Sequence, residues 1–120
     1  MYQVVELNRR NLYRRRVSVS MSGRRLLGYL LKWEYQPENR SRSWFLTIRE
    51  QRRALNRHFH RNPSLKSCIV DALEDGFEAG VDLALRETNL PLRTFPAKCP
   101  YNFEEVITDS FICDTSQDWE

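Results

Sequence analysis

Three prolines constrain the fold of this 120-residue chain most strongly, because each follows a stretch with helical periodicity. Before Pro37, Pro63 and Pro91, apolar residues recur every three or four positions, as they do on one face of an α-helix. A proline pushes the residue before it out of the α region, so a helix should end near each of them. The alternating segment VSVSMS is short and follows three arginines. The sequence therefore predicts an all-α fold.

The same pattern predicts three longer helices, over about 26–36, 41–62 and 64–89. Ser41 or Ser43 can cap the second of them, because a serine side chain accepts a hydrogen bond from a free backbone N–H of the first turn. Consecutive helices joined by such short connections run antiparallel. We therefore expect a small antiparallel helical bundle.

The remaining part of the predicted fold is a Pro-rich strap and a short C-terminal helix. Three prolines lie within residues 91–101, which we expect to be extended. Asn102 and Glu105 have the spacing of a capping box, which predicts a helix reaching about Ile107.

Two glycines lie inside the third predicted helix, at Gly76 and Gly80. Each costs about 1 kcal/mol relative to alanine in a helix interior. We expect a neighbouring helix to approach closely there, so that only glycine fits.

The charges of the chain are unevenly distributed. Residues 1–62 hold 15 Lys and Arg against 4 Asp and Glu, a balance of +11, whereas residues 63–120 hold 4 against 12, a balance of −8. The basic half could bind nucleic acid, or the two halves could neutralise each other inside one bundle. We favour neutralisation, because oppositely charged helices that pack together need no outside partner. The acidic residues expected to provide it are Asp71, Glu74, Glu78 and Asp82.

The stretch LKWEYQPENRSRSW concentrates aromatic and basic residues around Pro37. Trp33 and Trp44 flank the turn, and each can bury on the order of 200 Å² of surface. We expect both rings to fold inward and fix the angle between the first two helices, with Arg40 and Arg42 reaching outward or stacking on them. The alternative is a surface that binds an anionic partner.

A row of arginines on the second predicted helix is the strongest candidate for a binding surface. Arg49, Arg53 and Arg57 follow at i, i+4 and i+8, with Arg42 at the start of the helix. Such a row can follow a phosphate backbone, although no short helix-turn-helix with base-reading residues accompanies it. The candidate interaction residues are Arg42, Arg49, Arg53, Arg57, Trp33 and Trp44.

Catalytic and metal-binding patterns are weak. His58 and His60 are two residues apart, so on a helix they point to different faces and do not readily share a metal ion. Cys99 lies beside Lys98, but no base is nominated for it, and we expect a buried thiol that anchors the strap. The sequence predicts neither a cofactor nor a metal, and no catalysis.

Location follows from cysteine usage and hydropathy. Three scattered cysteines fit free thiols better than a disulfide framework, and the chain begins without an apolar signal stretch. No run of 18 apolar residues occurs, so nothing is expected to span a membrane. We expect a cytoplasmic protein.

Several motifs together resemble a known family. LLKWEYQPENRSRSW, TIREQRR, NPSL, ETNLPLRTFP and KCPYNFEEVI are similar to the bacterial, largely cyanobacterial family known as domain of unknown function twenty-nine. The resemblance covers about residues 26–112 and implies an all-helical domain without an assigned activity. Residues 1–25 depart from it and are Arg-rich, and residues 113–120 form an acidic tail.

We therefore expect a non-catalytic helical domain that acts through protein–protein contact, with an acidic or apolar partner or with itself. An apolar stripe that the bundle leaves uncovered would mark such an interface. The alternative is a nucleic-acid-binding accessory protein that uses the arginines of the second helix.

Overall fold

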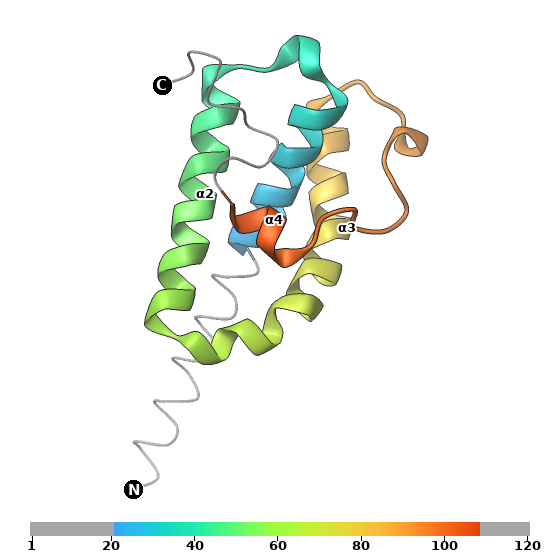
Figure 1. The fold of residues 1–120 in the computed structure, drawn as a ribbon. Coiled ribbons are helices and arrows are strands. Elements are labelled where there is room, and N and C mark those ends of the chain that lie inside the picture. Colours follow the sequence, from blue (N-terminus) through green and yellow to red (C-terminus); the bar gives the residue numbers. More distant parts are fainter. Residues whose placement is uncertain (1–20, 109–120) are drawn as a thin grey trace, which may run out of the picture.

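The computed structural model describes residues 21–108, except for the side chains of residues 66–70 (Figure 1). Over these residues the chain forms four α-helices and no strand, which confirms the all-α prediction. The α-helices are α1, which includes residues 21–35, α2 (Arg42–Arg61), α3 (Ile69–Glu87) and α4 (Phe103–Ile107). Three 3₁₀ helices connect them: η1 (Pro37–Asn39), η2 (Pro63–Cys68) and η3 (Leu92–Thr94).

Local signals set the bounds of α2. The Ser41 hydroxyl accepts a hydrogen bond from the Trp44 backbone N–H at 3.2 Å and caps the helix, as expected. The helix ends at Arg61, with Asn62 as the last capping residue before Pro63.

The start of the third helix differs from the prediction. An α-helix was expected from about residue 64, but η2 occupies this stretch and α3 begins only at Ile69. The Leu65 N–H donates to the Asn62 carbonyl at 2.9 Å, which is an i to i+3 bond of the 3₁₀ type. The connection is therefore a tighter turn than α-helical periodicity suggests.

The short helix α4 forms as predicted. The Asn102 side chain accepts from the Glu105 N–H at 2.9 Å, and the Glu105 carboxylate accepts from the Asn102 N–H at 3.1 Å. This reciprocal pair is the capping box, and it satisfies two backbone donors at the start of the helix. The helix ends at Ile107, where the sequence placed it.

Figure 1 shows α1 between α2 and α3, with α4 lying across the bundle. Consecutive long helices run in opposite directions, so α2 is antiparallel to α1 and to α3. Apolar side chains from all four helices and from the strap form one core. Its fully covered members include Leu26, Leu27, Leu30, Leu31, Trp33, Ile48, Ala84 and Val106.

Glycines bring α1 and α3 together. A Cβ atom on Gly80 would lie 3.1 Å from the Gly28 backbone nitrogen and 3.3 Å from the Arg24 carbonyl oxygen. Both distances are shorter than ordinary van der Waals contact, so the expected close approach is confirmed at Gly80. Gly76 differs, because a Cβ atom there would meet its nearest neighbours at 3.6 Å. The role of Gly28 was missed, since α1 gave no sign of which helix it meets.

The close approach gives a stability prediction. Gly80→Ala should lower the free energy of unfolding by about 1–3 kcal/mol, because the backbone of α1 would have to shift. Gly76→Ala is the matched control and should be neutral or raise stability by about 0.5–1 kcal/mol, because alanine is the better helix former. Chemical denaturation measures both. Equal losses at the two positions would contradict this packing.

The domain bounds set from the sequence stay a prediction. The boundary at residue 26 falls inside α1, because residues 21–25 are already helical. The first 20 residues and the acidic tail at 113–120 lie outside the described residues.

Candidate interaction surface

The turn between α1 and α2 is built around Trp33, which is 1% exposed. Its ring packs at a tilt against Phe45, with 6.5 Å between the ring centroids. Arg40 donates from Nε to the Trp33 carbonyl oxygen at 2.7 Å, and its guanidinium carbon lies 5.1 Å from the centre of the Trp33 ring. The ring that was a candidate for binding a partner is thus already covered by a cation of the same chain.

Lys32 lies between two other aromatic rings of this turn, those of Tyr29 and Trp44. Its side chain is almost fully buried, and the ammonium nitrogen lies 4.1 Å from the Tyr29 ring centre and 4.4 Å from that of Trp44. The same nitrogen is 3.5 Å from Glu87 Oε1 at the end of α3. Burial lowers the pKa of Lys32, and the charge of Glu87 acts in the opposite direction.

The inward-folding prediction therefore holds fully for Trp33 and in part for Trp44. Trp44 is half-buried and packs against the edge of the core. Of the two turn arginines, Arg40 stacks on a ring, whereas Arg42 is exposed. The basic and aromatic residues of the turn mostly satisfy each other, so the turn is a corner of the bundle.

The arginine row (Arg42, Arg49, Arg53 and Arg57) lies on the outside of α2. Arg49 is half-buried and the other three are exposed. Among residues 21–108, none of these four forms an ion pair or hydrogen bond with a described carboxylate. Leu46, which is 43% exposed, lies among them.

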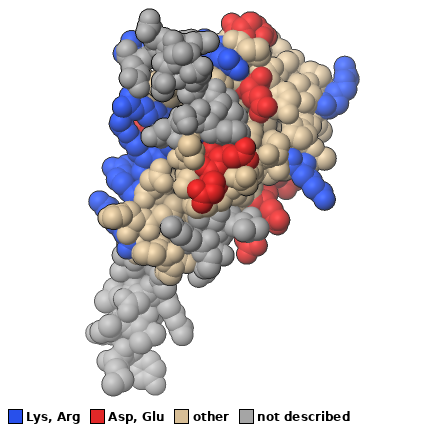
Figure 2. Space-filling model, in the orientation of Figure 1, with Lys and Arg blue, Asp and Glu red and all other residues tan. Residues whose placement is uncertain are grey.

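The expected neutralisation of this row by α3 does not occur. The reason is the order of the helices, because α1 separates α2 from α3 (Figure 1). Figure 2 shows most of the Lys and Arg gathered along the edge formed by α2, with Asp and Glu over other parts of this face and further Lys and Arg at the opposite edge. The arginine row on α2 and the acidic residues of α3 therefore lie on different sides of the bundle.

A fifth arginine of α2 has a different role. Arg52 is 1% exposed; its Nε donates to the Val106 carbonyl oxygen at 2.8 Å and its Nη2 to that of Glu105 at 3.4 Å. Carbonyls in the last turn of a helix lack partners within that helix, and a cation there also interacts favourably with the helix dipole. Arg52 thereby ties α4 to α2. Its position between Ile48 and Leu55 on the apolar face was the sequence signal for this role.

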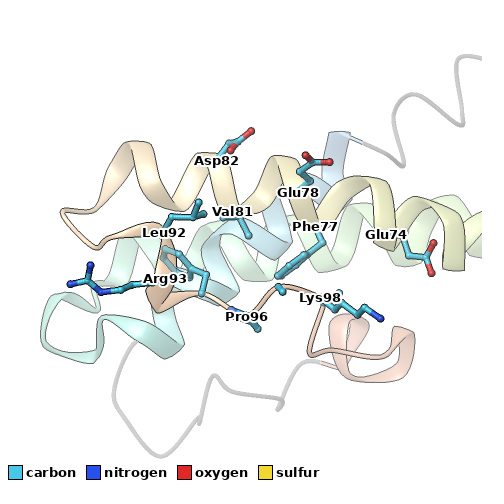
Figure 3. Close-up of a pocket in the computed structure, with 12 residues that line it drawn as sticks. Glu74, Phe77, Glu78, Val81, Asp82, Leu92, Arg93, Pro96 and Lys98 are labelled. Carbon is cyan, nitrogen blue, oxygen red and sulfur yellow. The ribbon is translucent and has the colours of Figure 1, made fainter.

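A groove of about 1020 Å³ lies between α3 and the strap that follows it. Phe77, Val81 and Phe95 line it and are buried, whereas Leu92 is 65% exposed. Figure 3 shows Leu92 at the end of the groove near Asp82, with Glu74 at the opposite end. The sequence predicted the strap but not the groove, because nothing in the local pattern shows that the strap stands away from α3.

Cys99 lines the groove from the strap. Its thiol donates to the Tyr101 carbonyl oxygen at 3.4 Å. Burial raises the pKa of Cys99, Glu105 raises it further, and the hydrogen bond to Tyr101 acts in the opposite direction. The thiol is half-buried and packs against the core. This arrangement agrees with the anchoring role expected from the sequence.

The Tyr101 hydroxyl makes a second link between the strap and the bundle. It donates to the Glu34 carboxylate at the end of α1. Burial raises the pKa of Tyr101, as does the hydrogen bond to Glu34, so the phenol stays protonated. The strap is thus held to the rest of the bundle at its C-terminal end.

Within the described part of the chain, no three His, Cys, Asp or Glu side chains cluster closely enough to hold a metal ion. None of the helices described here is long and apolar enough to cross a lipid bilayer. The absence of a cofactor stays a prediction.

Together these features define a small all-α domain with a basic helix face and a separate groove whose α3 side is acidic. A family model described as Domain of unknown function DUF29 matches residues 6–112, so the chain belongs to this family. The resemblance noted in the sequence is confirmed, and the match begins at residue 6 rather than residue 26. No curated protein matched the chain, and neither did any solved structure.

Proposed function

We propose that this domain is a non-catalytic module of the cytoplasm that binds an acidic protein surface through the outer face of α2. The observation that carries the proposal is the arginine row, which lies at the surface without a carboxylate partner among residues 21–108. Four cations along one face create a strong positive potential that attracts an anionic partner. The odd number of scattered cysteines supports a reducing compartment.

The spacing of the row fits a helical partner. Arg49, Arg53 and Arg57 are four residues apart, which is about 6 Å along a helix axis. Carboxylates at i, i+4 and i+8 of a second helix repeat at the same distance. Exposed ion pairs contribute only about 0.2–1 kcal/mol each, so apolar contact must add to them. Leu46 supplies an apolar side chain within the row, for which a phosphate backbone offers no counterpart.

The proposal predicts binding to an amphipathic helical peptide that carries glutamate at i, i+4 and i+8 beside a leucine. The triple change of Arg49, Arg53 and Arg57 to glutamine should weaken this binding about 10- to 100-fold, because three ion pairs are lost. Fluorescence anisotropy of the labelled peptide measures the affinity. A peptide with glutamine in place of glutamate should bind the unchanged protein as weakly as the glutamate peptide binds the triple variant.

A matched control separates the row from net charge. The triple change of Arg24, Arg25 and Arg86 to glutamine removes three exposed arginines that lie outside α2. Its affinity for the glutamate peptide should stay within about twofold of the unchanged protein, the effect of long-range charge alone at physiological salt. Equal losses in both triple variants would contradict a site on α2.

Nucleic acid is the second candidate partner, and one observation favours it. The acidic face of α3 was an argument against such binding, but α1 separates α3 from the row (Figure 1). A nucleic-acid module would bind random-sequence duplex more tightly than the generic ~10⁻⁴–10⁻⁶ M, with a log–log salt slope of roughly −2.7 for three phosphates. Our proposal expects only generic binding. The Arg-rich N-terminus needs a separate test with a variant lacking residues 1–20, since α1 includes residues 21–25.

A further inference from the structure

We propose that the acidic surface recognised by α2 belongs to a second copy of this chain, and that it is the α3 side of the groove between α3 and the strap. This inference rests on the proposed function, because it names the partner of the same basic face. The two surfaces lie on different sides of one molecule, so neither can satisfy the other within a single chain (Figure 1).

The charges of the two surfaces are opposite in sign and equal in spacing. The acids lie on the α3 side of the groove, whereas Arg93 and Lys98 lie on the strap side. Glu74, Glu78 and Asp82 follow at i, i+4 and i+8 on α3, and all three are exposed. Among residues 21–108, none of them forms an ion pair or hydrogen bond with another described side chain. The arginine row repeats at the same interval on α2. Three consecutive pairs can therefore form at once when the two helices lie side by side.

The apolar residues of the two surfaces match as well. The exposed large apolar side chains of the described residues are Met21, Leu46 and Leu92. Leu46 lies within the basic row, and Leu92 lies at the mouth of the groove. The groove also contains the covered rings of Phe77 and Phe95, so a leucine that enters it is removed from water.

Only one direction of docking brings both matches together. Leu92 lies near Asp82, at the end of the groove opposite Glu74 (Figure 3). Leu46 lies one turn before Arg49 in α2. An antiparallel arrangement that places Arg49 opposite Asp82 therefore carries Leu46 toward the Leu92 end of the groove. The same arrangement places Arg53 opposite Glu78 and Arg57 opposite Glu74.

Charge reversal tests this pairing at its central contact. Arg53→Glu and Glu78→Arg should each weaken self-association at least about tenfold, because each places like charges opposite one another. An equimolar mixture of the two variants should associate as well as the unchanged protein, and so should the double variant R53E/E78R. Sedimentation velocity over a concentration series measures this. This expectation is the same for a closed dimer and for an open chain of subunits. In both, each contact between the two different variants places a positive residue opposite a negative one.

Serine substitutions test the apolar part with a matched control. Leu46→Ser and Leu92→Ser should each weaken self-association about threefold or more. Met21 lies outside both surfaces and is 62% exposed, close to the 65% of Leu92, so Met21→Ser should not weaken it. Circular dichroism should show unchanged helicity for all of these surface variants.

The outcomes separate this inference from the proposed function. A protein that stays monomeric at all concentrations overturns the inference, as does a mixture of R53E and E78R that associates no better than either variant alone. If the monomeric protein still binds the glutamate peptide through Arg49, Arg53 and Arg57, the proposed function stands with a different partner. If the protein neither self-associates nor binds the glutamate peptide, both proposals fail.

Discussion

Trp33→Ala should lower the free energy of unfolding by about 3–5 kcal/mol, as truncations of large buried aromatics do. The indole is 1% exposed and packs against Phe45 in the core. Its removal also takes away the ring under the Arg40 guanidinium, which caps the turn through the Trp33 carbonyl. Urea denaturation measures the loss from the midpoint and slope of the transition.

Trp44→Ala is the control from the same turn. The Trp44 ring is half-buried at the edge of the core, with Lys32 over its face, so a clearly smaller loss is expected. The sequence alone predicts equal burial for the two tryptophans, and the structure distinguishes them. A loss below about 1 kcal/mol at Trp33, the size typical of an ordinary substitution, would show that its ring is exposed in solution.

Local chemistry explains why much of the fold was predictable. A proline ends a helix through a steric clash with its neighbour, and a capping serine or asparagine begins one through a single hydrogen bond. Both effects act within a few residues, so the sequence shows them directly. For this reason the ends of α2 and all of α4 agree with prediction. The start of α3 did not, because a segment of 6 residues is too short to distinguish a 3₁₀ period from an α period.

The candidate site depended on contacts between distant parts of the chain, which local patterns do not show. The row on α2 and the acids on α3 were expected to meet because their charges are opposite, but charge says nothing about which helix lies between them. Gly28 carries the missing information: its partner is Gly80, and their contact places α1 against α3. A glycine in α1 was visible in the sequence, but its partner was not.

Lys32 shows the same limit at the level of one residue. In the sequence it is one of several basic residues near Trp33, and such a side chain is ordinarily exposed. In the structure it is buried between two rings and paired with Glu87, which lies at the far end of α3. The aromatic and basic side chains of the turn therefore satisfy one another, whereas the arginine row on α2 has no such partners among residues 21–108.

Arg52→Ala should produce a loss of about 2–5 kcal/mol, because two carbonyl groups lose their charged donor, at about 1–3 kcal/mol each. The carbonyls of Val106 and Glu105 would lose charge-assisted donors in the last turn of α4. The exposed neighbour Arg53 is the matched control, and Arg53→Ala should change stability by no more than about 0.5 kcal/mol. Chemical denaturation of the two variants measures the difference.

Amide hydrogen exchange distinguishes local undocking of α4 from destabilisation of the whole bundle. If Arg52 holds α4 against α2, Arg52→Ala should speed amide exchange in α4 more than in α3, since α4 has only five residues and cannot persist alone. Arg52→Lys keeps the charge but not the planar fork that reaches two carbonyls, so its loss should be intermediate. Uniform exchange across all helices in Arg52→Ala would mean that Arg52 supports the whole core. Faster exchange confined to α4 would establish that α4 is docked chiefly by this one buried side chain.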